Sequence, residues 1–228
     1  MNNTTVDWNR IDTVMLDMDG TLLDLHFDSH FWLDHLPRRY AEIRGLPEAE
    51  AREALHGTIK HLEGRLEWYC LDHWRDLLDM DIVALKREVA HLIAVHPHVT
   101  EFLDAARLDG KQVWLVTNAH YDSLELKMER TGLGGHFDRL ICSHEFRRPK
   151  EDRGFWGALR RRYPFTPERT LFVDDNIHVL DSAREYGIRH CLAVRHPDTG
   201  RPRKDDVGDY PAIEDFRDLL PGGSLRIG

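Results

Sequence analysis

The sequence has few cysteines and no long apolar run. Cys70, Cys142 and Cys191 are the only cysteines among 228 residues, and their wide spacing and odd number argue against a disulfide framework. No stretch has the length and lack of charge that a membrane-spanning helix needs, and the first residues lack the basic and apolar segments of an export signal. These absences predict a cytoplasmic protein without a membrane anchor.

Positive charge is also scarce. Basic residues number 31 against 40 acidic ones, which gives a net charge of −9 at pH 7. A chain with this balance repels the phosphates of nucleic acids and of anionic membrane surfaces. We therefore expect neither nucleic acid nor membrane as a partner, and any phosphate that the protein binds must be held by a few local groups.

Helical apolar spacing fills the region from about residue 29 to residue 94 without an intervening strand. It predicts helices over residues 31–44, 47–65, 67–80 and 82–95. Because consecutive helices can pack on one another without a sheet, we expect them to form a separate module. Trp68 and Tyr69 in this region could form a wall that stacks on a nucleobase, or could simply belong to the core of an amphipathic helix.

The rest of the chain alternates between strands and helices. Apolar runs predict a first strand that ends at residue 16 and further strands over residues 112–117, 139–143, 170–174 and 190–195. Helices are predicted between them, over residues 99–108, 123–131, 153–163 and 178–186. This alternation is typical of an α/β fold with a doubly wound parallel sheet. A loop over residues 196–209 and a last short helix over residues 212–220 complete the prediction.

Two carboxylates follow the first predicted strand, in the stretch Asp17-Met18-Asp19-Gly20-Thr21. Side chains at positions i and i+2 of an extended chain project to the same side, so Asp17 and Asp19 can face one point beyond the sheet. Gly20 permits a turn that larger residues resist. An Asp-Gly turn after a strand is common for structural reasons alone, but open α/β sheets bind ligands at this edge.

Further polar groups follow three other predicted strands: Thr117 and Asn118, then Lys150, then Asp174 and Asp175. Taken singly, they could be helix caps or a solvated charge run. Taken together, they bring carboxylates, a hydroxyl and an ammonium group to one edge of a parallel sheet. Carboxylate oxygens suit Mg²⁺, a carboxylate can attack phosphorus, and the ammonium group can stabilise the transferred charge.

These motifs, in this order and with a helical insert after the first, resemble those of the haloacid dehalogenase-like (HAD) phosphohydrolases with a C1-type cap. The resemblance implies a Rossmann-like catalytic core formed by residues 1–24 and 96–228, and a helical cap domain formed by residues 25–95. It also implies a Mg²⁺-dependent phosphomonoesterase that works through an aspartyl-phosphate.

The resemblance assigns a role to each motif residue. Asp17 would be the nucleophile and a metal ligand, and Asp19 the general acid and base that also offers its backbone carbonyl to the metal. The remaining roles are phosphate binding by Thr117, Asn118 and Lys150 and metal binding by Asp174 and Asp175.

Shorter stretches resemble the bacterial GMP/IMP nucleotidase branch of that family. They are Leu23-Asp24-Leu25-His26-Phe27-Asp28, Glu67-Trp68-Tyr69-Cys70-Leu71-Asp72, Thr117-Asn118-Ala119-His120 and Pro149-Lys150-Glu151-Asp152. This likeness implies a purine nucleoside 5′-monophosphate, GMP or IMP, as the substrate. The base would then stack on cap aromatics, with Trp68 and Tyr69 as the first candidates.

Other functions stay open at this point. A phosphatase of phosphoglycolate or of a sugar phosphate would need no aromatic wall, and a phosphomutase would share every catalytic residue. A HAD-fold binding module without turnover is a non-enzyme alternative, although no catalytic position is replaced. A dehalogenase would not need the acid at Asp19 to protonate an alcohol. Nothing in the sequence indicates the oligomeric state.

Two positions depart from the family pattern. Many members carry a further acid four residues after the second aspartate of the last motif, where this chain has Val179, with Asp181 close behind. An aromatic residue is expected before Pro149 in the nucleotidase branch, where this chain has Arg148. The outer shell of the metal and the rim facing the substrate are the parts of the site that these departures affect.

Overall fold

A parallel sheet forms the centre of the computed structural model, which describes residues 6–62 and 64–220. The strands occur in the order β3-β2-β1-β4-β5-β6, and every neighbouring pair is parallel. Their bounds are β1 Thr13–Leu16, β2 Gln112–Thr117, β3 Arg139–Cys142, β4 Thr170–Asp174, β5 His190–Val194 and β6 Ala212–Ile213. The predicted α/β class with a doubly wound parallel sheet is confirmed.

The edge strand β6 corrects one prediction. Ala212 and Ile213 pair with β5, and only a short 3-10 helix, Phe216–Leu219, follows them. The predicted helix over residues 212–220 is therefore wrong. A two-residue strand carries too little alternation to be distinguished from a helical turn in the sequence, and its assignment depends on hydrogen bonds to β5.

Register places the ends of the central strands at the same level. Leu16 of β1 is paired with Leu115 of β2 on one side and with Val173 of β4 on the other. The next residues along these strands are therefore close neighbours at the carboxyl edge. All four residues of β1 are buried, as the unbroken apolar run predicts for a central strand.

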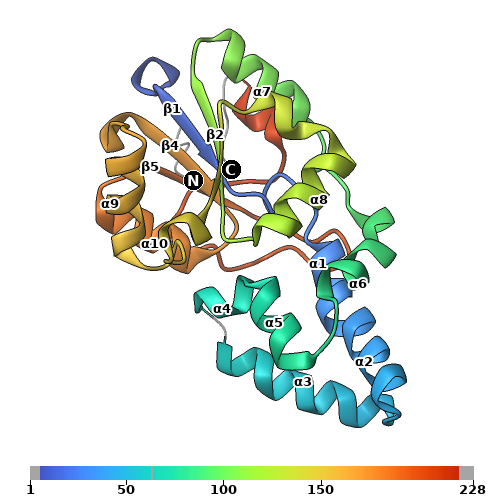
Figure 1. The fold of residues 1–228 in the computed structure, drawn as a ribbon. Coiled ribbons are helices and arrows are strands. Elements are labelled where there is room, and N and C mark those ends of the chain that lie inside the picture. The colour runs from blue at the N-terminus through green and yellow to red at the C-terminus, as the bar shows by residue number, and fades with distance from the viewer. Residues whose placement is uncertain (1–5, 63, 221–228) are drawn as a thin grey trace.

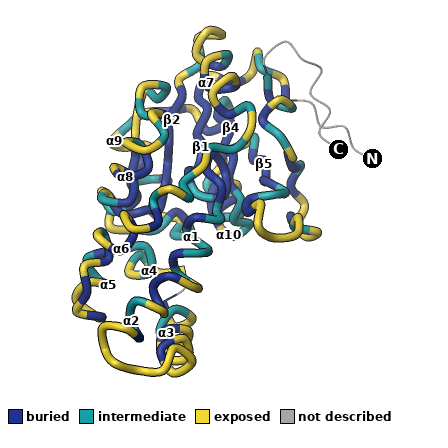
Figure 2. The backbone as a smooth tube through the Cα atoms, turned by 90° about the vertical axis from the view of Figure 1, so that its right-hand side faces the viewer, coloured by how far each residue is buried: buried dark blue, intermediate teal, exposed yellow. Residues whose placement is uncertain are grey.

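Helices cover both faces of the sheet (Figure 1). α7 (Val99–Leu108) and α8 (Tyr121–Thr131) lie on one face, and α9 (Arg153–Arg162) and α10 (Ile177–Tyr186) lie on the other. Side chains alternate along β1 accordingly: Val14 and Leu16 join the core on the α7 side, whereas Met15 joins the core on the α9 side. Figure 2 shows the central strands as the most deeply buried part of the chain.

The helices from α1 to α6 lie together beyond the carboxyl ends of the strands (Figure 1). They share an apolar core that includes Phe31, Leu55, Trp74 and Leu85, to which α8 adds Leu126. Their bounds are α1 His26–His30, a π-helix Phe31–His35, α2 Leu36–Arg44, α3 Glu48–Leu62, α4 Leu66–Tyr69, α5 Leu71–Leu78 and α6 Ile82–Glu88. No helix in the described parts of the chain is long and apolar enough to span a bilayer.

One predicted helix is divided in two. The backbone of Cys70 is extended and separates α4 from α5, where the sequence predicts one helix over residues 67–80. The Trp74 indole donates a hydrogen bond to the carbonyl of Trp68 at 2.8 Å across this break. The break puts Trp68 and Tyr69 on a short helix of their own.

Candidate active site

Three carboxylates meet at the carboxyl ends of β1 and β4. Asp17 follows β1, Asp174 ends β4 and Asp175 comes next, and each offers an oxygen within 4.8 Å of those of the other two. Asp17 and Asp174 are both buried. The predicted meeting of strand ends therefore occurs, because the parallel register sets both ends at one level.

The ammonium group of Lys150 lies between two of these carboxylates. It donates hydrogen bonds to Asp17 Oδ1 at 2.5 Å, to Asp174 Oδ2 at 2.7 Å and to the carbonyl of Val116 at 3.0 Å. Lys150 stands in the loop that follows β3, and its side chain is 2% exposed. The long lysine side chain thus reaches from a peripheral strand to the centre of the sheet edge.

Asn118 holds this loop in place. Its Oδ1 accepts a hydrogen bond from the backbone N–H of Lys150 at 2.9 Å, and its Nδ2 donates one to Glu151 at 2.9 Å. The sequence predicts a phosphate-binding role for Asn118, whereas the contacts in this structure position Lys150. Thr117, at the end of β2, is buried beside it, and its hydroxyl oxygen accepts the N–H of Ala119 at 3.0 Å.

The charges of the cluster do not cancel. Burial and the neighbouring Asp174 raise the pKa of Asp17 to about 7, against the lowering effect of Lys150. Burial likewise raises the pKa of Asp174 to about 6 and also raises that of Asp175. Burial alone would lower the pKa of Lys150, but the two carboxylates that it contacts raise it instead. Two ammonium groups, Lys150 on Asp17 and Asp174 and Lys204 on Asp175, face three carboxylates. This leaves an excess of negative charge, which a bound cation would neutralise.

The donor set fits a hard divalent metal. All three candidate ligands are carboxylates, with no thiol or imidazole in the group. Oxygen-only sites of this kind suit ions that retain some of their water. Asp17, Asp174 and Asp175 are the residues whose side chains would hold the metal.

Gly20 lets the chain pass close to Asp175. Its φ is +80°, and a Cβ built at this position would lie 2.8 Å from the Cγ of Asp175. Any side chain here would therefore displace one of the candidate metal ligands. This close approach gives the glycine of the first motif a structural reason.

We expect Gly20→Ala to weaken metal binding as well as the fold. The positive φ alone should lower the free energy of unfolding by about 1–2 kcal/mol. Gly45→Ala is a matched control, because Gly45 also has a positive φ of +65° but no atom within 4 Å of the added Cβ. Denaturant unfolding and calorimetric titration with a divalent metal should show a similar loss of stability in both variants but weaker metal binding only in Gly20→Ala. Equal metal affinity in the two would contradict the role of the close approach.

A cavity of about 730 Å³ opens from this cluster toward the helical region. Its lining includes Asp17, Lys150 and the other polar strand ends, and also Trp32, Trp68 and Tyr69 from the helical region. The sequence-predicted catalytic and aromatic residues are thus brought to a single cavity. Trp32 was not predicted to belong to it, because its helical spacing indicates core packing.

The two aromatic candidates, Trp68 and Tyr69, differ in how firmly their side chains are held. The hydroxyl of Tyr69 donates to Glu151 at 2.7 Å, and burial together with that carboxylate raises its pKa well above the ordinary value. Tyr69 is therefore held against the Lys150 loop. Trp68 is half-buried and packs against Trp32, with ring centroids 5.2 Å apart.

The loop over residues 196–209 also reaches the cavity, through Arg201, Lys204 and Asp206. Lys204 donates to the backbone carbonyl of Asp175 at 2.7 Å and to its carboxylate at 3.0 Å. Sequence reasoning missed these residues because a loop rich in proline, glycine and charge resembles an ordinary surface loop.

The sequence model of the haloacid dehalogenase-like hydrolases matches residues 11–187 of this chain. The chain belongs to this family. GMP/IMP nucleotidase YrfG of Escherichia coli is 41% identical to it over 216 residues, which cover 95% of this chain and 97% of that protein. Pyrophosphatase PpaX of Bacillus velezensis is 23% identical over 185 residues, covering 79% of this chain and 82% of that protein.

Solved structures support the same fold. A HAD phosphatase from Thermococcus onnurineus has a TM-score of 0.78 at 22% identity and covers 95% of this chain and 100% of its own. A β-phosphoglucomutase described as putative, from Thermotoga maritima, has a TM-score of 0.64 at 19% identity, covering 92% of this chain and 97% of its own. The predicted family membership and its hydrolase class are therefore confirmed.

The two departures of this HAD-like hydrolase from the family pattern fall in different places. Val179 belongs to α10, where it is buried in the core and also lines the cavity. Asp181 accepts hydrogen bonds from Tyr210 at 2.7 Å and Arg184 at 2.9 Å. Asp181 is thus engaged elsewhere and does not substitute for the missing acid. Arg148 donates to Asp152 at 2.8 Å on the surface.

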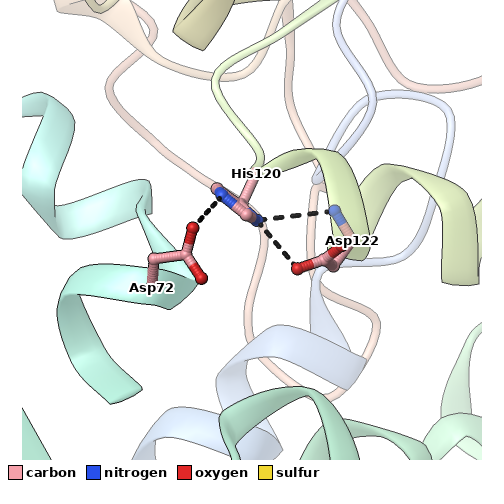
Figure 3. Close-up of side chains that lie close together, drawn as sticks. All are labelled: Asp72, His120 and Asp122. Carbon is pink, nitrogen blue, oxygen red and sulfur yellow. Dashed lines mark hydrogen bonds and ion pairs between the residues drawn. The ribbon is translucent and has the colours of Figure 1, made fainter. Parts of the chain in front are cut away.

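A second group of possible metal ligands, Asp72, His120 and Asp122, joins α5 to the start of α8 in this HAD-like hydrolase (Figure 3). His120 Nδ1 accepts the backbone N–H of Asp122 at 3.4 Å, so Nε2 faces Asp72 Oδ2 at 3.5 Å. Both aspartate side chains are about half exposed, and both imidazole nitrogens have partners within the protein. These contacts make the group a polar link between α5 and the start of α8.

Proposed function

We propose that this protein is a Mg²⁺-dependent nucleotidase that removes the phosphate from a purine nucleoside 5′-monophosphate. The observation that carries the proposal is that the carboxylate and lysine cluster and Trp68 of α4 line the same cavity. The 41% identity to a GMP/IMP nucleotidase over nearly the whole chain supports the substrate class. The oxygen-only ligand set supports Mg²⁺ among divalent metals.

The residues at the sheet edge divide the reaction between them. The carboxylate of Asp17 would attack phosphorus and form the aspartyl-phosphate, and Asp19 would protonate the departing oxygen and later deprotonate water. Lys150 and the hydroxyl of Thr117 would bind the phosphate oxygens and hold them in line. Bound Mg²⁺ would supply charge neutralisation at the same oxygens.

We infer that residues 25–95 form a cap domain over a catalytic core made of residues 1–24 and 96–228. Two observations support this division. The helices share an apolar core to which the rest of the chain adds only Leu126 among the buried residues described. The two crossings between the parts lie side by side, with the N–H of Asp24 bonded to the carbonyl of Ala94 at 2.9 Å. Such a cap would exclude water while the aspartyl-phosphate forms.

The experiment that tests the proposal is a phosphate-release screen with Mg²⁺ at matched substrate concentrations. It would compare nucleoside monophosphates with sugar phosphates and phosphoglycolate, and analyse products for phosphate that has been moved rather than released. A clear preference for GMP or IMP is expected. Preference for a sugar phosphate would refute the nucleotide proposal, and a lack of turnover with every metal would favour a binding module.

Trp68→Ala should separate base recognition from chemistry. Stacking on a base contributes about 1–3 kcal/mol, so kcat/KM for the preferred nucleotide should fall by about 5- to 150-fold. Turnover of p-nitrophenyl phosphate should stay near the wild-type rate, because that ester needs only the sheet-edge groups. Equal losses for both substrates would indicate that Trp68 supports the fold and does not recognise the base.

A further inference from the structure

A network of two buried lysines and two partly buried aspartates connects Asp19 to the helical region. Lys127 Nζ donates to Asp19 Oδ1 and to Asp28 Oδ2, both at 2.6 Å. Lys86 Nζ donates to the other oxygen of Asp28 at 2.7 Å. This network of charged side chains therefore runs from the loop after β1 through α8 and α1 to α6. In Figure 1, α1 and α6 lie beneath α8.

Burying these charged side chains is energetically unfavourable. The side chains of Lys127 and Lys86 are 1% and 2% exposed. Charges buried this deeply lose hydration energy that the attraction within an ion pair does not always recover. Replacing such a pair by apolar residues of similar volume often leaves a protein at least as stable. A stabilising effect on the contact between the helices and the sheet therefore does not by itself explain why two lysines and two aspartates occupy these positions.

Asp28 is the residue that binds both lysines of this network. Its burial raises its pKa, but Lys127 and Lys86 outweigh that effect and hold the pKa at about 2. Asp28 therefore stays ionised and binds both lysines through its two oxygens. Lys127 is thus held on the side opposite to Asp19.

We propose that Lys127 is the positioning residue for Asp19, an inference that rests on the proposed phosphatase mechanism. By binding Oδ1, Lys127 fixes the rotation of the carboxyl group and leaves Oδ2 to exchange a proton with the substrate. Asp28 holds Lys127 in turn, so the orientation of Asp19 depends on how α1 is seated against α8.

The step that Lys127 serves is the proton transfer to the leaving group. The carboxylate of Asp17 forms a bond to phosphorus while the bond from phosphorus to the ester oxygen breaks. The proton on Oδ2 of Asp19 moves to that oxygen, which leaves as an alcohol. Water then attacks phosphorus, the bond to Asp17 breaks, and a proton from water returns to Asp19. A misplaced Asp19 slows the first step most for esters whose leaving oxygen is strongly basic.

Two esters that differ in the leaving group test this role. The quantity to compare is kcat/KM, because it reports the steps up to release of the alcohol. Lys127→Met should lower kcat/KM for the preferred alkyl phosphate by about 10- to 100-fold and for p-nitrophenyl phosphate by less than about threefold. Lys86→Met is the matched control: it removes a buried lysine from the same aspartate, leaves the contact of Lys127 with Asp19, and should leave the ratio of the two values within about twofold of wild type.

Two further variants make the result decisive. Asp28→Asn weakens the outer hold on Lys127 and should produce the same selective loss to a smaller degree, so it decides the matter if Lys127→Met does not fold. Equal losses for both esters, or an unchanged ratio in a folded variant, would overturn the inference. Asp19→Asn should show the selective loss itself, and Lys127→Met should add little to it. If Asp19→Asn shows no selectivity, the proposed role of Asp19 fails, and the positioning role fails with it.

Discussion

Asp17→Asn is expected to abolish turnover and to leave the fold intact. Asparagine has nearly the same shape as aspartate but lacks the anionic oxygen that attacks phosphorus, so kcat should fall by at least about 1,000-fold. Lys150 would keep its hydrogen bonds to Asp174 and to the carbonyl of Val116, so the buried ammonium group would not be left without partners. The measurement is phosphate release with Mg²⁺, together with denaturant unfolding.

A control at the other end of β1 excludes a general effect of the substitution. Asp12 lies at the opposite end of β1, is exposed and pairs with Arg169. Asp12→Asn makes the same chemical change there and should leave turnover at the wild-type level. If Asp17→Asn kept even about a tenth of the wild-type rate, covalent catalysis at Asp17 would be wrong.

Lys150→Gln should affect both catalysis and stability. Removing a charge that stabilises the transferred phosphoryl group should lower kcat/KM by about 100- to 1,000-fold. It would also leave the carboxylates of Asp17 and Asp174 buried without their cation, which should reduce the free energy of unfolding by about 3–5 kcal/mol. Added Mg²⁺ should restore part of this stability, since a cation bound to the native carboxylates replaces some of the lost charge.

Lys111→Gln is the matched control for this prediction. The side chain of Lys111 is 12% exposed and donates to the carbonyl of Trp8 at 2.9 Å, near the opposite edge of the sheet. Its replacement should cost about 1 kcal/mol, the value of an ordinary hydrogen bond, and should not change turnover. A Lys150→Gln variant that is destabilised equally with and without Mg²⁺ would contradict the proposal that Lys150 and the metal neutralise the same carboxylates.

Local pattern was sufficient to predict most of the sheet and the centre of the site. β2 (Gln112–Thr117) and β4 (Thr170–Asp174) occur at the predicted residues, since buried parallel strands are continuous apolar runs bounded by polar residues. Because carboxyl ends of parallel strands share one edge, the sequence also predicted that Asp17, Lys150 and Asp174 would meet. The structure brings them within hydrogen-bond distance.

Local pattern was not sufficient where an element depends on its neighbours. β6 exists because β5 offers it hydrogen bonds, and its two residues carry no alternation of their own. The extended Cys70 that separates α4 from α5 lies within continuous helical spacing. In both places the tertiary contacts determine the backbone conformation, and propensity alone predicts the wrong element or too long a helix.

The sequence by itself determined the family, the parallel sheet and the identity of the strand-end residues, because these follow from periodicities and motifs that short segments carry. Only the tertiary structure decided which distant side chains surround them. Lys127 binds Asp19 across 108 positions of the chain, and Lys204 binds Asp175 from a loop with no regular structure. Such contacts depend on how helices pack and loops close over the sheet edge. Whether such a contact forms is therefore decided by packing interactions throughout the fold, and no short segment of sequence indicates it.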